Sequence, residues 1–475
     1  MTIFLRLLQL LIEGFNVLVL LYFVSLNFFY LMTSLFAFKA LRTYARQLKA
    51  IHIEELIASA GAPPITLIAP AYNEEPTCVA SIKALLALNY PEYEIIVVND
   101  GSQDKTVEKL IEAFDLSPAN RAPTANVPSA PVRTVYRSQH YANLWVVDKE
   151  NGGKADALNA GLNYCQTPLF CAMDADSILE RDALIRIARP FLEDSRTVAA
   201  GGIIRIVNDC TIRGGALTDI RLPKNWLAKF QVLEYLRAFL SGRMGWSALD
   251  STLIISGAFG IFKRSIVVDA GGYATDTVGE DMELIVKLHR HCREQRIPYK
   301  ISFVPDPVAW TECPETVKIL GRQRDRWQRG LYEVLTRHRV MFMNPRYGRI
   351  GLFAYPYFYL LEMLGPAIEM PGYVVFLIAV LTGTVSYTYI LAFFMAAFIF
   401  GMALSIFSVA LEELTFRRYP KTSDLLQLFF LAIVENFGYR QLTIYWRIHG
   451  FISALRNVQG WGKMERKGFH VEETG

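Results

Sequence analysis

Two aspartates, Asp174 and Asp176, form the sharpest chemical signal in the sequence. They directly follow the short apolar run 169–173. A spacing of two places both side chains on the same face of an extended segment. Two carboxylates this close repel each other unless a cation lies between them. A hard divalent ion that bridges diphosphate oxygens suits the pair, whereas the alternative is an ordinary solvated turn.

Polar side chains also follow two earlier apolar runs of strand length. Residues 65–69 lead toward Tyr72-Asn73-Glu74, and residues 95–98 lead into Asn99-Asp100-Gly101-Ser102. Ligands of open parallel sheets bind beyond the carboxyl ends of the strands. We therefore expect these two ends to share one crevice with the aspartate pair. There Asp100 can bind a nucleobase edge, or else it caps the helix that follows the turn.

Two further segments place charged residues at predicted helix starts. Asn151-Gly152-Gly153-Lys154 opens a helix, and its glycines would let backbone amides approach a phosphate while Lys154 adds a positive charge. Gly279-Glu280-Asp281 precedes an apolar-periodic helix, where a carboxylate can act as a general base toward an acceptor hydroxyl. The alternatives are a simple turn and an acidic first turn favoured by the helix dipole.

The segment 323–327 combines an amide, cations and an indole in the order Gln-Arg-Asp-Arg-Trp. Trp327 can stack on a sugar ring through its flat face. Arg326 can bind a diphosphate through its planar guanidinium. A surface helix with basic residues near a membrane is the alternative interpretation.

A sheet with intervening helices must position these residues. Residues 65–70, 94–98 and 169–173 have strand length, and helical patterns cover 76–88 and 104–114 between them. Strands that alternate with helices predict a mostly parallel α/β sheet. Residues 115–133, rich in Pro, Ala and Ser, are expected to form a loop.

The N-terminal segment predicts a membrane anchor. The chain is 52% hydrophobic and 20% charged, which fits a soluble domain with a few membrane spans. The uncharged run 15–38 is long enough to cross a bilayer and too long for a cleaved signal peptide. Its two flanks differ in charge, with Arg6 before it and, after it, Lys39, Arg42, Arg46 and Lys49. The positive-inside rule therefore places the following domain in the cytoplasm.

The C-terminal part predicts further membrane segments. Residues 350–381 form an apolar run interrupted by glycine and proline, and residues 387–411 form an uninterrupted one, which together indicate a hairpin with both ends in the cytoplasm. Residues 425–446 are apolar but contain Glu435, Asn436 and Arg440, so we expect an interfacial or re-entrant segment rather than a full span. Residues 39–60 and 222–250 have the pattern of interfacial helices, and for 222–250 a core helix is the alternative.

Composition excludes several other classes. The net charge of +4 and the lack of a basic stripe give no reason to expect nucleic acid binding. The six cysteines are scattered without a Cys-x-x-Cys pair, so neither a zinc site nor a disulfide framework is indicated. We expect buried, reduced thiols.

In this order, the motifs resemble those of family 2 glycosyltransferases. The set comprises Tyr72-Asn73-Glu74, Asp100-Gly101-Ser102, Gly153-Lys154-Ala155-x-Ala157-Leu158-Asn159, Asp174-x-Asp176, Glu280-Asp281 and Gln323-x-x-Arg326-Trp327. The chain is most similar in pattern to the membrane synthases of cellulose, hyaluronan, chitin and poly-N-acetylglucosamine. The resemblance covers residues 65–335, and the flanking apolar segments fit the same group.

The resemblance implies a GT-A fold and a role for each matching residue. Donor binding would fall to Tyr72, Glu74, Asp100, Lys154, Asp174 and Arg326. Asp176, with Asp174, would bind Mg²⁺ or Mn²⁺, and Asp281, beside Glu280, would be the catalytic base. Gln323, Arg326 and Trp327 would bind the acceptor. The usual Thr-Glu-Asp is Gly279-Glu280-Asp281 here, so one hydroxyl contact is missing. No PilZ-like regulatory domain follows the last apolar segment, so control by cyclic-di-GMP through one is not expected.

The sequence therefore predicts an inverting glycosyltransferase of the cell membrane that uses a UDP-sugar. We expect an N-terminal membrane segment at 1–64, a cytoplasmic GT-A domain at 65–344 and C-terminal membrane segments at 345–475. Processive synthesis of a β-linked polysaccharide coupled to export is the leading hypothesis. One alternative is the non-processive transfer of one sugar to a lipid or lipid-linked acceptor. Another is a membrane scaffold or receptor with a degenerate transferase domain. Contact with membrane lipids is expected, while the sugar, the linkage and partner proteins in export stay open.

Overall fold

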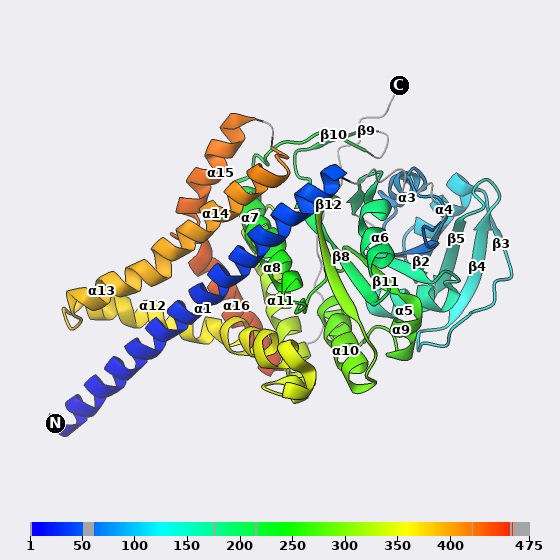
Figure 1. Ribbon diagram of the computed structural model, residues 1–475. Coiled ribbons are helices and arrows are strands. Elements are labelled where there is room, and N and C mark those ends of the chain that lie inside the picture. Colours follow the sequence, from blue (N-terminus) through cyan, green and yellow to red (C-terminus); the bar gives the residue numbers. More distant parts are fainter. Residues whose placement is uncertain are drawn as a thin grey trace.

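The computed structural model describes residues 2–50, 61–174, 177–213, 216–419, 421–456 and 458. Asp176 and the basic tail beyond residue 458 lie outside these residues. Figure 1 shows an α/β domain on the right and long helices on the left, with α1 running diagonally toward the N-terminus.

A ten-stranded mixed sheet organises the α/β domain, in the order β3-β4-β5-β2-β1-β6-β11-β8-β12-β7. Parallel pairing joins β5, β2, β1 and β6 in its centre, whereas β11 is antiparallel to both of its neighbours. The strand bounds are β1 Ile65–Ala71, β2 Tyr93–Asp100, β3 Leu116–Pro118, β4 Val132–Ser138, β5 Leu144–Lys149, β6 Leu169–Met173, β7 Ile178–Leu179, β8 Thr197–Ile206, β11 Phe259–Lys263 and β12 Lys300–Thr311. The three predicted strands are confirmed, and the predicted loop 115–133 also contains the short strand β3.

Helices cover both faces of this sheet, which explains why its central strands are mostly apolar. On one face, α3 (Cys78–Leu86), α4 (Thr106–Phe114) and α6 (Ala183–Glu193) pack with Ile65 and Leu67 in a buried cluster. On the other face, α5 (Lys154–Tyr164) and α10 (Glu280–Glu294) pack with Ile68 and Ile96. Each fully buried side chain of this size contributes about 1.5–3 kcal/mol. The two cores hold the strand ends, and with them the polar loops, in fixed positions.

Among the described residues, two helices are long and apolar enough to cross a membrane, or three if the bent pair is one span. The first is Leu10–Gln47, within α1 (Thr2–Ala50). The second is Tyr387–Thr415, formed by α13 (Tyr387–Phe394), η6 (Met395–Ile399) and α14 (Phe400–Thr415). By length and composition the chain is a membrane protein. The predicted interfacial helix 39–60 begins as the uninterrupted end of α1, and residues 51–60 lie outside the description.

The predicted broken span 350–381 is a bent helix pair. Ile350–Met363 and Gly365–Leu381 (α12) meet at an angle of 42°. Pro366 at the start of α12 lacks the amide hydrogen that a continuous helix would need there. The break therefore follows from the covalent structure of the chain.

The segment 425–446 is not one helix. It divides between α15 (Thr422–Val434) and α16 (Tyr439–Leu455), and Gly438 between them has a φ of +106° that disfavours other residues. The 13 residues of α15 rise about 20 Å, which is less than a bilayer core. The interfacial or re-entrant placement of this segment stays a prediction.

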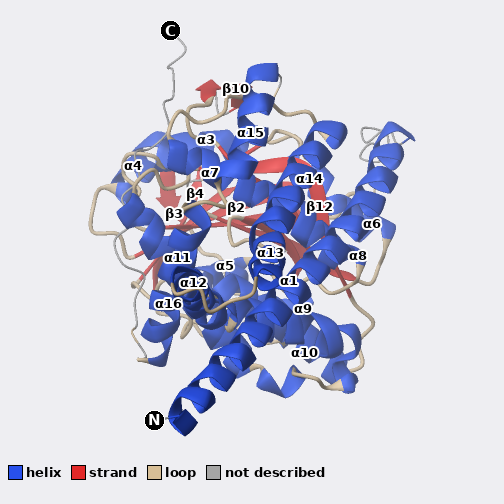
Figure 2. Cartoon of the chain, turned by 90° about the vertical axis from the view of Figure 1, so that its left-hand side faces the viewer, coloured by secondary structure: helices blue, strands red, loops and turns tan. Residues whose placement is uncertain are grey.

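Helix α16 packs against α11 (Val317–Arg337), the helix that carries the Gln-Arg-Asp-Arg-Trp segment. A Cβ atom at Gly321 would lie 2.7 Å from the indole nitrogen of Trp446, and one at Gly450 would lie 2.5 Å from the carbonyl oxygen of Asp325. Glycine at both positions lets the helices approach closely. Figure 2 shows α11, α12 and α16 gathered on one side of the molecule.

The segment 222–250 forms α7 (Trp226–Tyr235), the π-helix η1 (Leu236–Gly242) and α8 (Arg243–Ala248). Leu233, Leu236 and Leu240 are buried, whereas Trp226 is exposed. The segment packs against α1 and α14 on one side and the sheet on the other. It therefore joins the α/β domain to the apolar helices. Its buried leucines fit the predicted core helix, and its contact with the apolar helices fits the predicted interfacial helix.

Candidate functional site

One large cavity, of about 1520 Å³, is lined by every predicted site residue that the structure describes. These residues are Tyr72, Glu74, Asp100, Lys154, Asp174, Glu280, Asp281, Gln323, Arg326 and Trp327. The cavity lies at the carboxyl ends of β1, β2 and β6, where ligands of open α/β sheets bind. The predicted convergence of the three polar strand ends is therefore realised, and Asp176 alone of the predicted set lies outside the description.

Lys154 occupies the centre of the acidic part of the cavity. Its ammonium group forms an ion pair with Asp174, lies 3.4 Å from a carboxylate oxygen of Glu280, and donates to the carbonyl oxygen of Gly257 at 3.4 Å. Burial alone would lower the pKa of Lys154, but Asp174 and Glu280 outweigh it and hold that pKa above its ordinary value. Lys154 thus remains a cation at any physiological pH.

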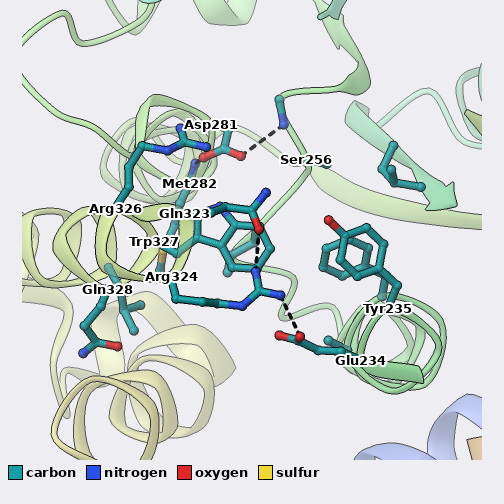
Figure 3. Close-up of a pocket in the computed structure, with 18 of the residues that line it drawn as sticks. Glu234, Tyr235, Ser256, Asp281, Met282, Gln323, Arg324, Arg326, Trp327 and Gln328 are labelled. Atoms are coloured by element: carbon teal, nitrogen blue, oxygen red, sulfur yellow. Dashed lines mark hydrogen bonds and ion pairs between the residues drawn. The ribbon is translucent and has the colours of Figure 1, made fainter. Parts of the chain in front are cut away.

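Glu280 and Asp281 begin α10, as the sequence predicts, but their surroundings differ. Glu280 is 4% exposed, and burial raises its pKa above the ordinary value, with Lys154 acting in the opposite direction and Asp281 adding to the rise. Asp281 is partly exposed and accepts a hydrogen bond from the backbone N–H of Gly257 at 3.1 Å. Figure 3 shows the Asp281 carboxylate beside the guanidinium of Arg326, with its dashed line running to the backbone nitrogen next to Ser256. Of the two acids, Asp281 has the better access to a substrate.

Asp100 holds the glycine loop that precedes α5. One carboxylate oxygen accepts from Lys149 at 2.5 Å and from the N–H of Gly152 at 3.0 Å, and the other accepts from the N–H of Gly153 at 2.8 Å. Lys149 is fully buried and also pairs with Asp156 at 2.7 Å. Asp100 therefore orients the loop that carries Lys154, and its predicted nucleobase contact stays a prediction.

Sequence reasoning did not single out Lys149. Its position at the end of β5, directly before the glycine loop, is the signal that could have found it. The pairing itself depends on β2 and β5 lying side by side, with Asp100 opposite Lys149 in the register.

The loop after β1 presents Tyr72 to the cavity with 46% of its surface exposed. Asn73 beside it has a φ of +55°, and its side chain accepts from the N–H of Gln103 at 2.8 Å. Glu74 accepts from the Thr77 hydroxyl at 2.7 Å. These contacts fix the loop and leave the ring of Tyr72 accessible to a ligand.

Helix α11 supplies the opposite wall of the cavity. The Gln323 carbonyl oxygen accepts from Arg324 at 2.8 Å, and the Arg324 guanidinium also pairs with Glu234 at 2.7 Å and lies 4.2 Å above the ring of Trp327. Trp327 keeps 37% of its surface exposed. Figure 3 shows this chain of contacts from Glu234 through Arg324 to Gln323, with Trp327 between α11 and Tyr235.

Sequence reasoning missed the supporting residues Arg324 and Glu234. Tyr439 of α16 donates to Glu234 at 2.9 Å, so α7, α11 and α16 meet at this point. Arg324 is 3% exposed, and its indication in the sequence was only its place inside the Gln-Arg-Asp-Arg-Trp segment.

The cavity continues between the apolar helices, where it is lined by polar side chains. Glu362 accepts from the hydroxyls of Tyr30 at 3.0 Å and Tyr357 at 2.6 Å, and pairs with Arg447 at 3.3 Å. Glu369 accepts from Tyr22 at 2.5 Å. Charged groups in membrane helices are costly and mark functional paths. Their signal in the sequence was two glutamates inside the apolar run 350–381.

The described residues contain no cluster of three His, Cys, Asp or Glu side chains suited to hold a metal ion. Of the predicted metal ligands Asp174 and Asp176, only Asp174 is among the described residues. Its side chain is 28% exposed and lies beside Lys154. The six cysteines are free and buried, as predicted.

The family described as "Glycosyltransferase like family 2" matches residues 63–330. Poly-beta-1,6-N-acetyl-D-glucosamine synthase of Staphylococcus aureus (strain COL) is 31% identical over 283 residues, which are 59% of this chain and 58% of that protein. The synthase of Staphylococcus epidermidis is 31% identical over 274 residues, 58% of this chain and 56% of that protein. The chain thus matches little more than half the length of these relatives.

Two solved structures are also similar. The mannosyltransferase PcManGT from Pyrobaculum calidifontis, in complex with GDP-Man and Mn²⁺, has a TM-score of 0.48 and 19% identity, covering 87% of this chain and 99% of that one. TarS 1–349 of S. aureus has a TM-score of 0.38 and 14% identity, covering 80% of this chain and 91% of that one.

Proposed function

The chain belongs to glycosyltransferase family 2, and from this premise we propose that it transfers a sugar from a UDP-sugar to a growing glycan with inversion at the anomeric carbon. One observation carries the proposal. A single cavity brings together the Lys154–Asp174 ion pair, the accessible carboxylate of Asp281, and the exposed ring of Trp327. A cation for phosphate, a base and a sugar platform are the three parts that such a transfer requires.

The nucleotide would bind at the ends of β1 and β2. The accessible ring of Tyr72 is suited to contact the base, while the loop fixed by Asp100 aims Lys154 at the diphosphate. Arg326, on the Asp281 side of the cavity, adds a second cation for the same group.

A divalent ion, Mg²⁺ or Mn²⁺, would bind at Asp174 and Asp176. Asp174 fits this role, since its carboxylate is a hard oxygen ligand that opens onto the cavity. When bound, such an ion supplies positive charge against the diphosphate oxygens. Lys154, the partner of Asp174, would then turn toward the phosphates.

The reaction follows from the positions of the two acids. Asp281 removes the proton of an acceptor hydroxyl, whose oxygen bonds to the anomeric carbon as the bond from that carbon to UDP breaks. Lys154 stabilises the negative charge that grows on the departing diphosphate. Buried Glu280 helps to keep Lys154 cationic. A single displacement inverts the anomeric centre, and the base contributes about 10²–10⁴ to the rate.

Processive synthesis of a β-linked polysaccharide, passed between the apolar helices, is the form of this activity that we propose. Its support is the continuation of the cavity from Trp327 to Tyr30 and Glu362. Aromatic and polar side chains contact sugar rings without fixing one register, so a chain can slide. UDP-N-acetylglucosamine is the first donor to test, because the similar curated proteins are poly-beta-1,6-N-acetyl-D-glucosamine synthases.

We place the transferase domain on the cytoplasmic face, because the cations Lys39, Arg42 and Arg46 follow the apolar part of α1. The six native cysteines are buried, so introduced cysteines can report exposure. Lys224→Cys in the domain and Lys467→Cys in the tail should resist an impermeant reagent on intact cells. Thr384→Cys, in the turn between α12 and α13, should react as the matched control. Labelling of the tail from outside would contradict this topology.

The decisive experiment supplies the purified membrane protein with UDP-N-acetylglucosamine and a panel of other UDP-sugars, and measures UDP release and product size. Long chains appearing while most acceptor is unused would support the proposal. One added sugar per acceptor would favour the lipid-linked alternative. No release from any donor, with or without acceptor, would favour the degenerate scaffold.

A further inference from the structure

Arg243, the first residue of α8, has an unusual position in the cavity. It lines the same space as Asp281, yet its buried Nη1 atom has no hydrogen-bond partner among the described residues. Among the described residues, no ion pair joins the Arg243 guanidinium to a carboxylate. By contrast, the buried guanidinium of Arg324 pairs with Glu234. A guanidinium N–H group that is buried without a hydrogen-bond partner is costly unless a ligand accepts from it.

The position of Arg243 is fixed by its surroundings. Its guanidinium lies 3.9 Å from the centre of the Phe239 ring. A Cβ atom at Gly245 would lie 2.3 Å from the carbonyl oxygen of Thr33, so α8 packs directly on the backbone of α1. The π-helix η1 ends immediately before Arg243, and such insertions occur often at functional sites. The side chain is therefore held at the cavity wall rather than free to turn into solvent.

Arg243 remains positively charged in this place. Burial lowers its pKa to about 10, although Asp281 and Tyr235 act in the opposite direction. The guanidinium thus offers N–H donors to the cavity at neutral pH.

The fold also shows which part of a substrate Arg243 faces. The proposed nucleotide end lies at β1, β2 and α5, where Lys154 is the cation. Arg243 lies at the other end, where α8 meets α1, and the cavity there is lined by Thr33 and Ser34. A sugar unit on its way from Asp281 to the apolar helices must pass this wall.

We propose that Arg243 binds the acceptor glycan, donating hydrogen bonds to hydroxyl or amide carbonyl oxygens of a sugar unit beside Asp281. The proposal rests on the proposed function, because it needs a glycan in the cavity. The guanidinium holds that unit while the next donor enters. It has five N–H donors in a fixed fork, and those not bonded to protein are available to the sugar.

The test compares Arg243→Met, Arg243→Lys and wild type. Arg243→Met should raise the KM for an oligosaccharide acceptor at least about tenfold and shorten the products, since the lost hydrogen bonds act on the acceptor alone. Arg243→Lys should fall between the two. The affinity for UDP should stay within about twofold in both variants. Arg196→Met, at a surface position with 61% of the side chain exposed, is the matched control and should behave as wild type.

Each other result counts against the inference. A loss of UDP affinity in step with activity would make Arg243 a diphosphate ligand, and unchanged acceptor kinetics would give it no binding role. If Arg243→Met does not fold, Arg243→Lys and Arg243→Gln decide by the same split between acceptor KM and UDP affinity. Failure of wild type to release UDP from any donor would instead overturn the proposed function.

Discussion

The two ends of the cavity are built in different ways. At the nucleotide end, strand ends and a glycine loop place Tyr72 and Lys154, and backbone N–H groups bonded to Asp100 hold the loop. At the acceptor end, helices α7, α11 and α16 place Trp327 through side-chain pairs such as Arg324 with Glu234. The first end is a rigid backbone frame, whereas the second depends on contacts between distant helices. This difference fits the proposed processive activity, in which the donor stays the same while the product moves.

Asp281, the proposed base between the two ends, gives the largest expected effect. Asp281→Asn should lower turnover by about 10²–10⁴, because the amide cannot accept the hydroxyl proton. UDP affinity should stay nearly unchanged, since the base acts on the acceptor. Retention of more than about a tenth of the wild-type rate would exclude Asp281 as the general base. Asp176→Ala, the matched change at the donor end, should instead weaken metal-dependent donor binding.

Replacing Lys149 tests the glycine loop of the nucleotide end, which Asp100 and Lys149 hold. Lys149→Met leaves Asp100 and Asp156 as buried carboxylates without their cation, which should destabilise the domain by about 3–5 kcal/mol. Thermal unfolding should shift downward, and UDP affinity should fall because the loop before Lys154 loses its anchor. Lys105→Met, which removes an exposed lysine of the same domain, is the control. Wild-type UDP affinity in Lys149→Met would show that Asp100 holds the loop without its cation.

These two ends also differ in how much the sequence predicts. Lys154, Asp174 and Asp281 each follow directly from a strand end or a helix start, so local patterns were enough to find them. Glu234 lies 90 positions before Arg324, and Tyr439 lies 205 positions after Glu234. No local pattern connects such residues, because helix packing brings them together.

The membrane part shows the same limit. The composition of residues 15–38 and 387–411 predicted two long apolar helices, and both are present. Hydropathy alone could not show that α1 continues without a break to Ala50. It also could not show that Arg237 pairs with Glu435, whose side chain would otherwise be buried without a cation. Pairing of charges across helices depends on rotation and register, which the sequence does not display.

The acceptor end can be broken at Trp327. Trp327→Ala removes the sugar platform and should shorten the products strongly while UDP affinity changes by less than about threefold, since aromatic contacts of about 0.5–1.5 kcal/mol or more act on the acceptor. Trp327→Phe should restore part of the product length. Product sizing and UDP titration give the two readings. Equal losses of product length and UDP affinity would show that Trp327 serves both ends, and the comparison between them would fail.

The smallest expected effect tests whether the acceptor end depends on charge or only on hydrogen bonding. Glu234→Gln keeps an oxygen that can accept from Arg324 and Tyr439, but removes the negative charge beside a buried guanidinium. A hydrogen bond between neutral and charged groups is weaker than one between two charges by about 1 kcal/mol, so the KM for the acceptor should rise about fivefold. Glu234→Ala removes both contributions and should have a larger effect, because Arg324 is then buried without an anion.

UDP affinity should remain at the wild-type value in both variants. If Glu234→Gln has no effect and Glu234→Ala does, geometry alone holds Trp327 in place. If both variants weaken UDP binding, α7 also supports the nucleotide end. The two binding sites would then be energetically coupled.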